Sequence, residues 1–395
     1  MTRNPAPREG LLLALLAAGS AASVGWVAAC HGAPTHTAAA PTATAAATSG
    51  PALLPAKDEA GVVAAANAFL ATLSDAQRAA VQIDLTHPLA ARWSNLPAGV
   101  VGRNGVFFRD LDAKQVAAAL EVARRALSPE GFARFQEIRA ADDAFAKVAS
   151  KHGPGFGPPG DHSGGPPHDH GPGAPLPGAG PDGAHGDLFG AANYMIAFLG
   201  KPSTTAPWLL QLGGHHVAFN VYFKGAVEAA TPYFVGVQPN VWTDDEGKTH
   251  APLAPLRDAM VSLVHSLPPN QLARARLDAR FDDVYVGPGR DGQFPVKSEG
   301  VLGSELAAPA KELLGRAIAA WTTDSVQGAD YAKVYDAELD RTRVAFSGSP
   351  ALEGHGDYVR IDGPHVWIEF ACQGNDHYHT IWRDRTSDYG AEFTF

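Results

Sequence analysis

The stretch "DYVRIDGPHVWIEFACQGNDHYHTIWRD" (357–384) decides the fold of this chain. Alternation with period two predicts strands that each turn one face toward a core. The dipeptides Asp362-Gly363 and Gly374-Asn375 are typical of tight hairpin turns. The stretch therefore predicts three antiparallel strands, at 357–363, 365–371 and 378–384.

The sequence before this region is mostly helical in pattern. From 57 to 150, apolar residues recur at spacings of three and four. Capping-box sequences at 74–77 and 112–115 predict helix starts, and Ser128-Pro129 predicts another. Helices followed by antiparallel strands predict an α+β fold, with N-terminal helices packed on a mainly antiparallel sheet built from the C-terminal half.

The middle of the chain adds elements of both kinds. The apolar run 188–200 is expected to form a helix that ends at Gly200. Residues 217–223 alternate apolar and other side chains, which predicts a strand with His216 and Asn220 opposite its apolar face. Two further helices are expected at 252–267 and 304–321.

The composition limits the class of partner. The chain has 395 residues, a formal net charge of −10 and a pI near 5.9. An acidic balance argues against nucleic acid or an anionic lipid surface as the main partner.

The first thirty residues predict export. Arg3 and Arg8 precede an apolar run, and residues 27–30, Val-Ala-Ala-Cys, resemble a bacterial lipobox. In that interpretation 1–30 is a lipoprotein signal, and Cys30 receives the lipid that anchors the protein to the cell envelope. A plain signal peptide or an uncleaved anchor helix are the alternatives.

The remaining chain is divided by composition. Residues 31–56 are rich in Ala, Thr and Pro and predict a disordered tether, followed by a single domain at 57–395. A Gly/Pro/His-rich insert at 151–187 interrupts this domain and predicts a flexible loop. Its histidines either bind metal weakly or are incidental to a biased segment.

The pleat of the strands predicts where the chemistry lies. His377, His379 and Arg383 share one face of the last strand. Glu369 and His216 each lie on the non-core face of another predicted strand. If these strands are neighbours in one sheet, His216, Glu369, His377 and His379 converge.

Such a set of side chains suits a divalent metal ion. Zinc sites combine histidine nitrogen with carboxylate oxygen, and copper or iron would also accept these ligands. His215 or His365 would substitute for one ligand. Arg383 would position a substrate, and Asp384 or Asp388 would orient a histidine.

Two other interpretations of these residues stay open. Arg383 and Arg385 with Asp384 and Asp388 would form a salt-bridged C-terminal clasp without a metal. Alternatively, the histidines line a metal-free pocket as hydrogen-bonding groups. Enzyme motifs do not decide between them. The stretch "GPGRDG" (287–292) lacks the helix that a dinucleotide site needs, and no H-E-x-x-H or G-x-S-x-G is present.

Several blocks resemble a bacterial and fungal family known as domain of unknown function 3500. They follow one another from about residue 57 to the end: "FLATLSDAQR" (69–78), "RWSNLP" (92–97), "GVFFRDLD" (105–112), "ALSPEGFARFQEI" (126–138), "LGGHHVAFNVYF" (212–223), "TPYFVGVQPN" (231–240), "YVRIDGPHVWIEF" (358–370) and "HYHTIWRDRTSDYG" (377–390). The resemblance implies one family domain and no particular activity. It carries the family's G-H-H block onto His215 and His216. Its acidic position and last block fall on Glu369, His377, His379, Arg383 and Asp384.

Together these features predict an exported, lipid-anchored metalloprotein. A metal-dependent hydrolase that acts on a small anionic or carbonyl compound is the leading function, with zinc as its ion. Oxidation by copper or iron is the alternative chemistry. A surface binding protein with an aromatic pocket and a metal-buffering lipoprotein are non-enzymatic alternatives.

Overall fold

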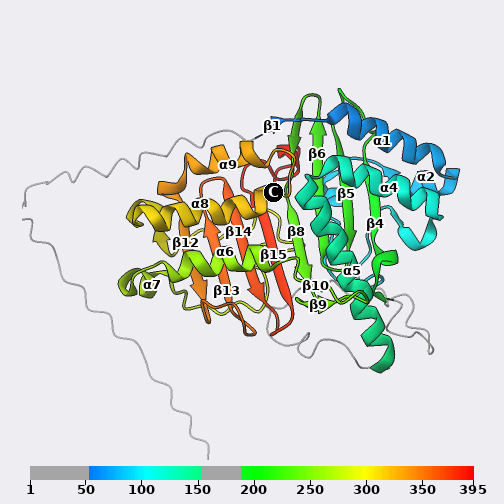
Figure 1. Cartoon of the computed structure of the whole chain (residues 1–395). Helices are drawn as coiled ribbons and strands as arrows, with labels where there is room; N and C mark the ends of the chain where they lie inside the picture. Colours follow the sequence, from blue (N-terminus) through cyan, green and yellow to red (C-terminus); the bar gives the residue numbers. More distant parts are fainter. Residues whose placement is uncertain (1–52, 153–187) are drawn as a thin grey trace, which may run out of the picture. The chain divides into compact units, whose positions relative to one another are not determined.

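The computed structural model describes residues 53–152 and 188–395, and one large β-sheet organises them (Figure 1). Along the main path of this sheet the described strands lie in the order β11 (Val301–Leu302), β12 (Arg343–Ser347), β13 (Tyr358–Asp362), β14 (Val366–Cys372), β15 (Tyr378–Asp384), β8 (Tyr233–Val237), β6 (Val217–Lys224), β5 (Trp208–Gly214), β4 (Met195–Leu199) and β2 (Gln82–Ile83). Beside the path, β1 (Leu54–Pro55) pairs with β7 (Val227–Ala229), β7 pairs with β6, and β3 (Val106–Phe107) pairs with β4. A separate small hairpin joins β9 (Trp242–Thr243) to β10 (Thr249–His250).

The predicted fold class is confirmed. Within the described ranges the pairs of the large sheet are antiparallel apart from β2 with β4. The helices are α1 (Glu59–Thr72), α2 (Asp75–Val81), α3 (His87–Ala90), α4 (Ala113–Ala126), α5 (Pro129–His152), α6 (Ala254–His265), α7 (Pro269–Ala275), α8 (Ala308–Thr322) and α9 (Gly328–Asp336). Both predicted capping boxes form, at Ser74 with Gln77 and at Asp112 with Gln115.

One face of the sheet forms the main apolar core under the helices. In Figure 1, α6, α8 and α9 lie over one half of the sheet, and α1, α4 and α5 lie over the other. The predicted core residues of β14, Val366, Ile368 and Phe370, are fully buried in this layer. Burying each large apolar side chain stabilises the fold by about 1.5–3 kcal/mol, so this layer fixes which way every strand faces.

The opposite face is covered mainly by extended segments and is partly polar. Residues of 83–93 and 277–284, together with Tyr389 and Phe393 near the C-terminus, pack on Ala218, Phe234 and Ile381. Glu369 of β14 and His379 and Arg383 of β15 lie on this face, beside Ile381, and are buried nevertheless. Buried polar groups need hydrogen-bond partners, so this face is where specific polar contacts are expected.

Two sequence-based expectations about local structure are wrong. The run 188–200 does not form the expected helix: a 3-10 turn at Ala191–Asn193 precedes strand β4. All five residues of β4 are buried, and a strand buried on both faces has no alternation that distinguishes it from a buried helix. The expected tether also ends too late, because Leu54 pairs with Glu228 across β1 and β7.

Other predictions fall outside the described residues. They are the signal with Cys30, nearly all of the tether, and the His-rich insert beyond His152. Among the residues that are described, no helix is both long and apolar enough to cross a bilayer.

Candidate metal centre

The last strand carries its histidines into the middle of the sheet. Strand β15 lies between β14 and β8, and all seven of its residues are buried. His379 is level with Ala371 of β14 on one side and Gly236 of β8 on the other. All seven residues pair with β14 and residues 378–382 also pair with β8, so this strand can hold polar groups in fixed positions close to the chain end.

His216 reaches the same place from a hairpin. Gly214 pairs with Val217, so His215 and His216 form the two-residue connection between β5 and β6. His216 has a φ of 67°, in the left-handed region that costs a non-glycine residue about 1–3 kcal/mol. Its N–H donates to the carbonyl of Asn95 at 2.9 Å, and its carbonyl accepts from the N–H of Gly236 at 2.7 Å. These bonds hold the unusual conformation in place.

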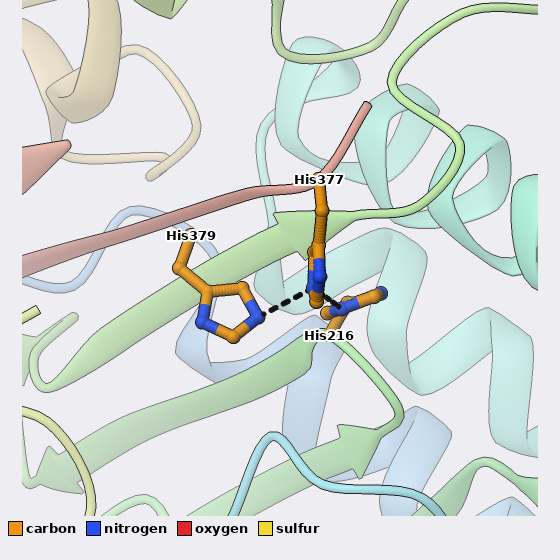
Figure 2. A group of neighbouring side chains, drawn as sticks. All are labelled: His216, His377 and His379. Carbon is orange, nitrogen blue, oxygen red and sulfur yellow. Dashed lines mark hydrogen bonds between the residues drawn. The ribbon is translucent and has the colours of Figure 1, made fainter. Parts of the chain in front are cut away.

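The three imidazoles of His216, His377 and His379 converge on one point (Figure 2). The Nε2 atom of His377 lies 2.8 Å from Nε2 of His216 and 3.0 Å from Nε2 of His379. One ring nitrogen from each residue lies within 4.8 Å of the others, and all three residues are buried. The predicted convergence of these three histidines is therefore present.

Gly236 makes room for the convergence. Strand β8 separates β15 from β6, so a side chain at this level would stand between the histidines. A Cβ on Gly236 would lie 2.8 Å from Cδ2 of His379 and 2.9 Å from Cδ2 of His216. Sequence reasoning missed this residue, although a glycine inside the strand-like run "YFVGV" is a signal for close approach of other groups.

Two carboxylates fix the surrounding rings. Asp283 Oδ1 lies 2.8 Å from Nδ1 of His379, on the side of the ring away from the cluster. Asp142 Oδ1 lies 2.6 Å from Nδ1 of His215, whose ring packs on that of His216 with centroids 3.7 Å apart. Carboxylates in this position orient a ligating histidine and raise its basicity. Neither aspartate follows from a local pattern, because both come from segments distant in the sequence.

Burial favours the neutral form of His216 and His377. Burial, with the neighbouring imidazoles of His215, His377 and His379, lowers the pKa of His216 well below its usual value. Burial also lowers the pKa of His377, with contributions from His379 and His215. Neutral imidazole is the form that binds a metal ion, so these nitrogens are available as ligands at pH 7.

Glu369 does not lie with the three histidines. Its carboxylate accepts hydrogen bonds from the N–H groups of Tyr285 and Val286, from Tyr358 Oη and from Trp367 Nε1. A carboxylate has about four acceptor sites, so these four donors leave no lone pair for an ion. Of the four ligands expected from the sequence, Glu369 is therefore excluded and the three histidines remain.

The two substitute ligands also have other partners. His215 contacts Asp142, as described above, and adds a packing surface rather than a nitrogen to the cluster. His365 precedes β14, and its Nδ1 lies 2.9 Å from Glu338 Oε1. Neither belongs to the group of side chains placed to share one ion among the described residues.

The arginine and aspartates of the last block form a structural network. Arg383 Nε donates to the carbonyl of Val286 at 2.7 Å, and its Nη1 donates to Asp291 and Asp388, each at 2.8 Å. Asp384 accepts from the N–H groups of Thr386 and Ser387. The pairing of Arg383 with Asp388 matches part of the alternative clasp, and it coexists with the histidine cluster.

The arrangement suits a metal ion bound by three nitrogens. Tetrahedral zinc with bonds of about 2.0–2.1 Å separates its nitrogen ligands by about 3.3 Å. The Nε2 separations of 2.8 and 3.0 Å are slightly shorter, so small ring rotations would admit an ion. Three neutral ligands would leave its double charge uncompensated and one position open to water, which favours a lowered pKa of that water.

Comparison with known proteins agrees with the sequence blocks described above. No curated protein and no solved structure matches the chain significantly. The profile of one family, described as "Protein of unknown function (DUF3500)", matches residues 55–391 and so spans nearly the whole described fold. The chain therefore belongs to the DUF3500 family.

Proposed function

We propose that this protein binds a divalent metal ion through His216, His377 and His379. The observation that carries the proposal is the approach of three Nε2 atoms from two distant parts of the chain. Zinc fits best, because it commonly takes three histidines and keeps a fourth position open in catalytic sites. Copper and iron also accept such ligands and are the alternatives.

The supported chemistry is hydrolysis of a small carbonyl or anionic compound. A zinc ion with three neutral ligands supplies hydroxide near neutral pH or polarises a carbonyl group. Asp283 would hold His379 in one orientation and one tautomer. Oxidation by copper or iron is the second candidate, because both metals also accept imidazole ligands.

Metal analysis of the purified full chain tests the proposal. One equivalent of zinc is expected in the wild type, and His379→Ala should lose it. His265→Ala is the matched control, because His265 is exposed on α6 and lies outside the cluster. Full zinc content in His379→Ala would refute the site. One equivalent of copper or iron would support the site and move the chemistry to oxidation.

The His-rich insert is tested in the same experiment. Replacing His152, His162, His168, His170 and His185 by asparagine should leave the stoichiometric ion in place. Loss of all bound metal in that variant would instead indicate a metal-buffering protein. If the wild type carries metal, hydrolysis of p-nitrophenyl acetate that disappears in His379→Ala would support the enzymatic function.

We also propose that the protein is exported and anchored to the cell envelope by a lipid on Cys30. The support is the lipobox-like sequence at 27–30 after a basic start and an apolar run. The substrate would then be a small molecule outside the cytoplasm. The net charge of −10 continues to disfavour nucleic acid as a partner.

A further inference from the structure

The segment that supplies Asp283 has no secondary structure of its own. Residues 277–300 connect α7 to β11 without a helix or strand. Such a segment lacks a ladder of backbone hydrogen bonds, so its position depends on contacts with the sheet. The position of Asp283, and therefore its contact with His379, has to be set by those contacts.

Two buried side chains of opposite charge hold this segment. Glu369 accepts from the N–H groups of Tyr285 and Val286, the latter at 2.8 Å. Arg383 donates to the carbonyls of Val286 at 2.7 Å and of Gly287 at 3.2 Å. Both side chains are fully buried, and hydrogen bonds to buried charged groups are stronger than those between neutral groups. The backbone at 285–287 is thus fastened from both its N–H and its C=O sides.

This fastening lies two residues from the carboxylate that contacts the cluster. Asp283 Oδ1 accepts from the N–H of Val284 at 2.7 Å and contacts His379 Nδ1 at 2.8 Å. The side chain of Asp283 is 45% exposed, so little else confines it. A shift of the backbone at 285 would move Asp283 relative to His379.

We propose that Glu369 is a positioning residue for the three-histidine site, which acts on His379 through the backbone at 285–286 and Asp283. The inference rests on the proposed metal site and deepens it. Glu369 binds no ion in this arrangement; it sets the orientation of one ligand and thereby the affinity and ligand field of the site. Arg383 supports the same segment from its carbonyl side.

Cobalt binding by the full chain tests this role. Co²⁺ replaces zinc in nitrogen sites, and its visible absorption reports the geometry of its ligands. In Glu369→Gln an amide N–H₂ replaces one carboxylate oxygen and cannot accept a hydrogen bond from the N–H groups of Tyr285 and Val286. The segment 285–287 should therefore detach from the sheet. We expect affinity for Co²⁺ and Zn²⁺ to fall about 10- to 100-fold and the cobalt spectrum to change, as for other residues that orient ligands.

Two comparisons separate positioning from general destabilisation. Glu228→Gln replaces another buried carboxyl group, on β7, and should leave affinity and spectrum unchanged. Asp283→Asn should reproduce the effect of Glu369→Gln, and the double variant should lose little more than either single variant. Additive losses, or a lowered thermal midpoint with the wild-type spectrum and affinity, would overturn the proposal.

The outcomes also separate this inference from the metal site itself. A wild-type protein that binds neither Co²⁺ nor Zn²⁺ ends both proposals. A wild type that binds Co²⁺, with a Glu369→Gln variant that binds it identically, ends only the positioning role. If Glu369→Gln does not fold, Tyr358→Phe removes one donor at 2.8 Å from Glu369. That variant should shift the cobalt spectrum in the direction seen for Asp283→Asn, and an unchanged spectrum counts against positioning.

Discussion

The Nε2 atoms of His216 and His377 lie 2.8 Å apart, although the two histidines are 161 positions apart in the chain. The first lies in a hairpin connection and the second immediately precedes a strand two places away in the sheet. Two neutral imidazole nitrogens at this distance inside a protein either share a hydrogen bond with each other or bind the same metal ion. The predictions below follow from this geometry and from the contacts around it.

Gly236→Ala should weaken metal binding. The added methyl would lie within 2.9 Å of carbon atoms in the rings of His216 and His379, so the rings must move apart. Overpacking of this kind costs about 1–3 kcal/mol of folding stability. Zinc titration and thermal unfolding measure the two effects. Gly102→Ala is the control, because a Cβ there meets nothing within 4 Å. Wild-type zinc affinity in Gly236→Ala would contradict the cluster geometry.

Zinc should raise the thermal midpoint of the wild-type protein. An ion that binds only the folded state stabilises it by about 2.7 kcal/mol at a free concentration 100 times its Kd. Calorimetry with and without zinc measures this shift, and EDTA should reverse it. His377→Ala should abolish the shift, whereas His265→Ala should keep it. An equal shift in His377→Ala would mean that zinc binds elsewhere.

Glu228 should make the fold less stable as pH rises. Burial raises the pKa of Glu228 to about 8, with Gln327 Nε2 donating to Oε2 at 2.6 Å. Because the folded pKa lies above the unfolded one, the folded state holds an extra proton between about pH 4.5 and 8. The free energy of unfolding therefore falls across this interval, by a few kcal/mol at most, roughly 1.4 per pKa unit.

Glu228→Gln should remove this pH dependence, since glutamine stays neutral. Thermal midpoints measured at pH 5, 6, 7 and 8 should show that the stability of the variant relative to the wild type increases as pH rises. Glu246→Gln, at an exposed position, is the control and should follow the wild type. Parallel curves for Glu228→Gln and wild type would show that Glu228 is already ionised in the folded state.

Tyr389→Phe should destabilise the fold without changing metal content. Trp93 Nε1 donates to Tyr389 Oη at 2.6 Å, and that hydroxyl donates to Asp291 Oδ1 at 2.9 Å. Removing the hydroxyl leaves the buried Trp93 Nε1 without its acceptor and takes one donor from Asp291, which costs about 1–3 kcal/mol. Thermal unfolding and zinc analysis measure the two properties. A change within about 0.5 kcal/mol would resemble a surface substitution and contradict the proposed cost.

Cys30→Ala should release the protein from the membrane fraction. Loss of the acceptor thiol prevents lipid attachment, so the variant should appear in the soluble fraction. Mass spectrometry of the wild-type N-terminal peptide should find a lipidated cysteine. A mature wild-type chain that begins elsewhere, or an unmodified Cys30 inside a longer peptide, would refute the lipid anchor.

Much of the fold is readable from local pattern. The strand predicted at 378–384 is β15 with the same bounds, and the capping boxes mark the starts of α2 and α4. The pleat also assigned His379 and Arg383 to one face, because side chains alternate along a strand whatever its neighbours are. The helix predicted at 188–200 is wrong because a strand buried on both faces, as β4 is, carries no such alternation.

The candidate site, too, is only partly predictable from local pattern. The sequence by itself determined that His377 and His379 point together and that Glu369 lies on the same sheet face, since both follow from the two-residue period. Only the tertiary structure decided that β8 lies between β15 and β6 and that Gly236 leaves room there for the histidine rings. It also decided that Asp283, and not the predicted Asp384, contacts a histidine of the cluster. The tertiary structure likewise decided that the Glu369 carboxylate accepts hydrogen bonds from the backbone at 285–286. The physical reason is range: alternation depends on adjacent residues, whereas strand order and loop position depend on packing between residues far apart in the chain.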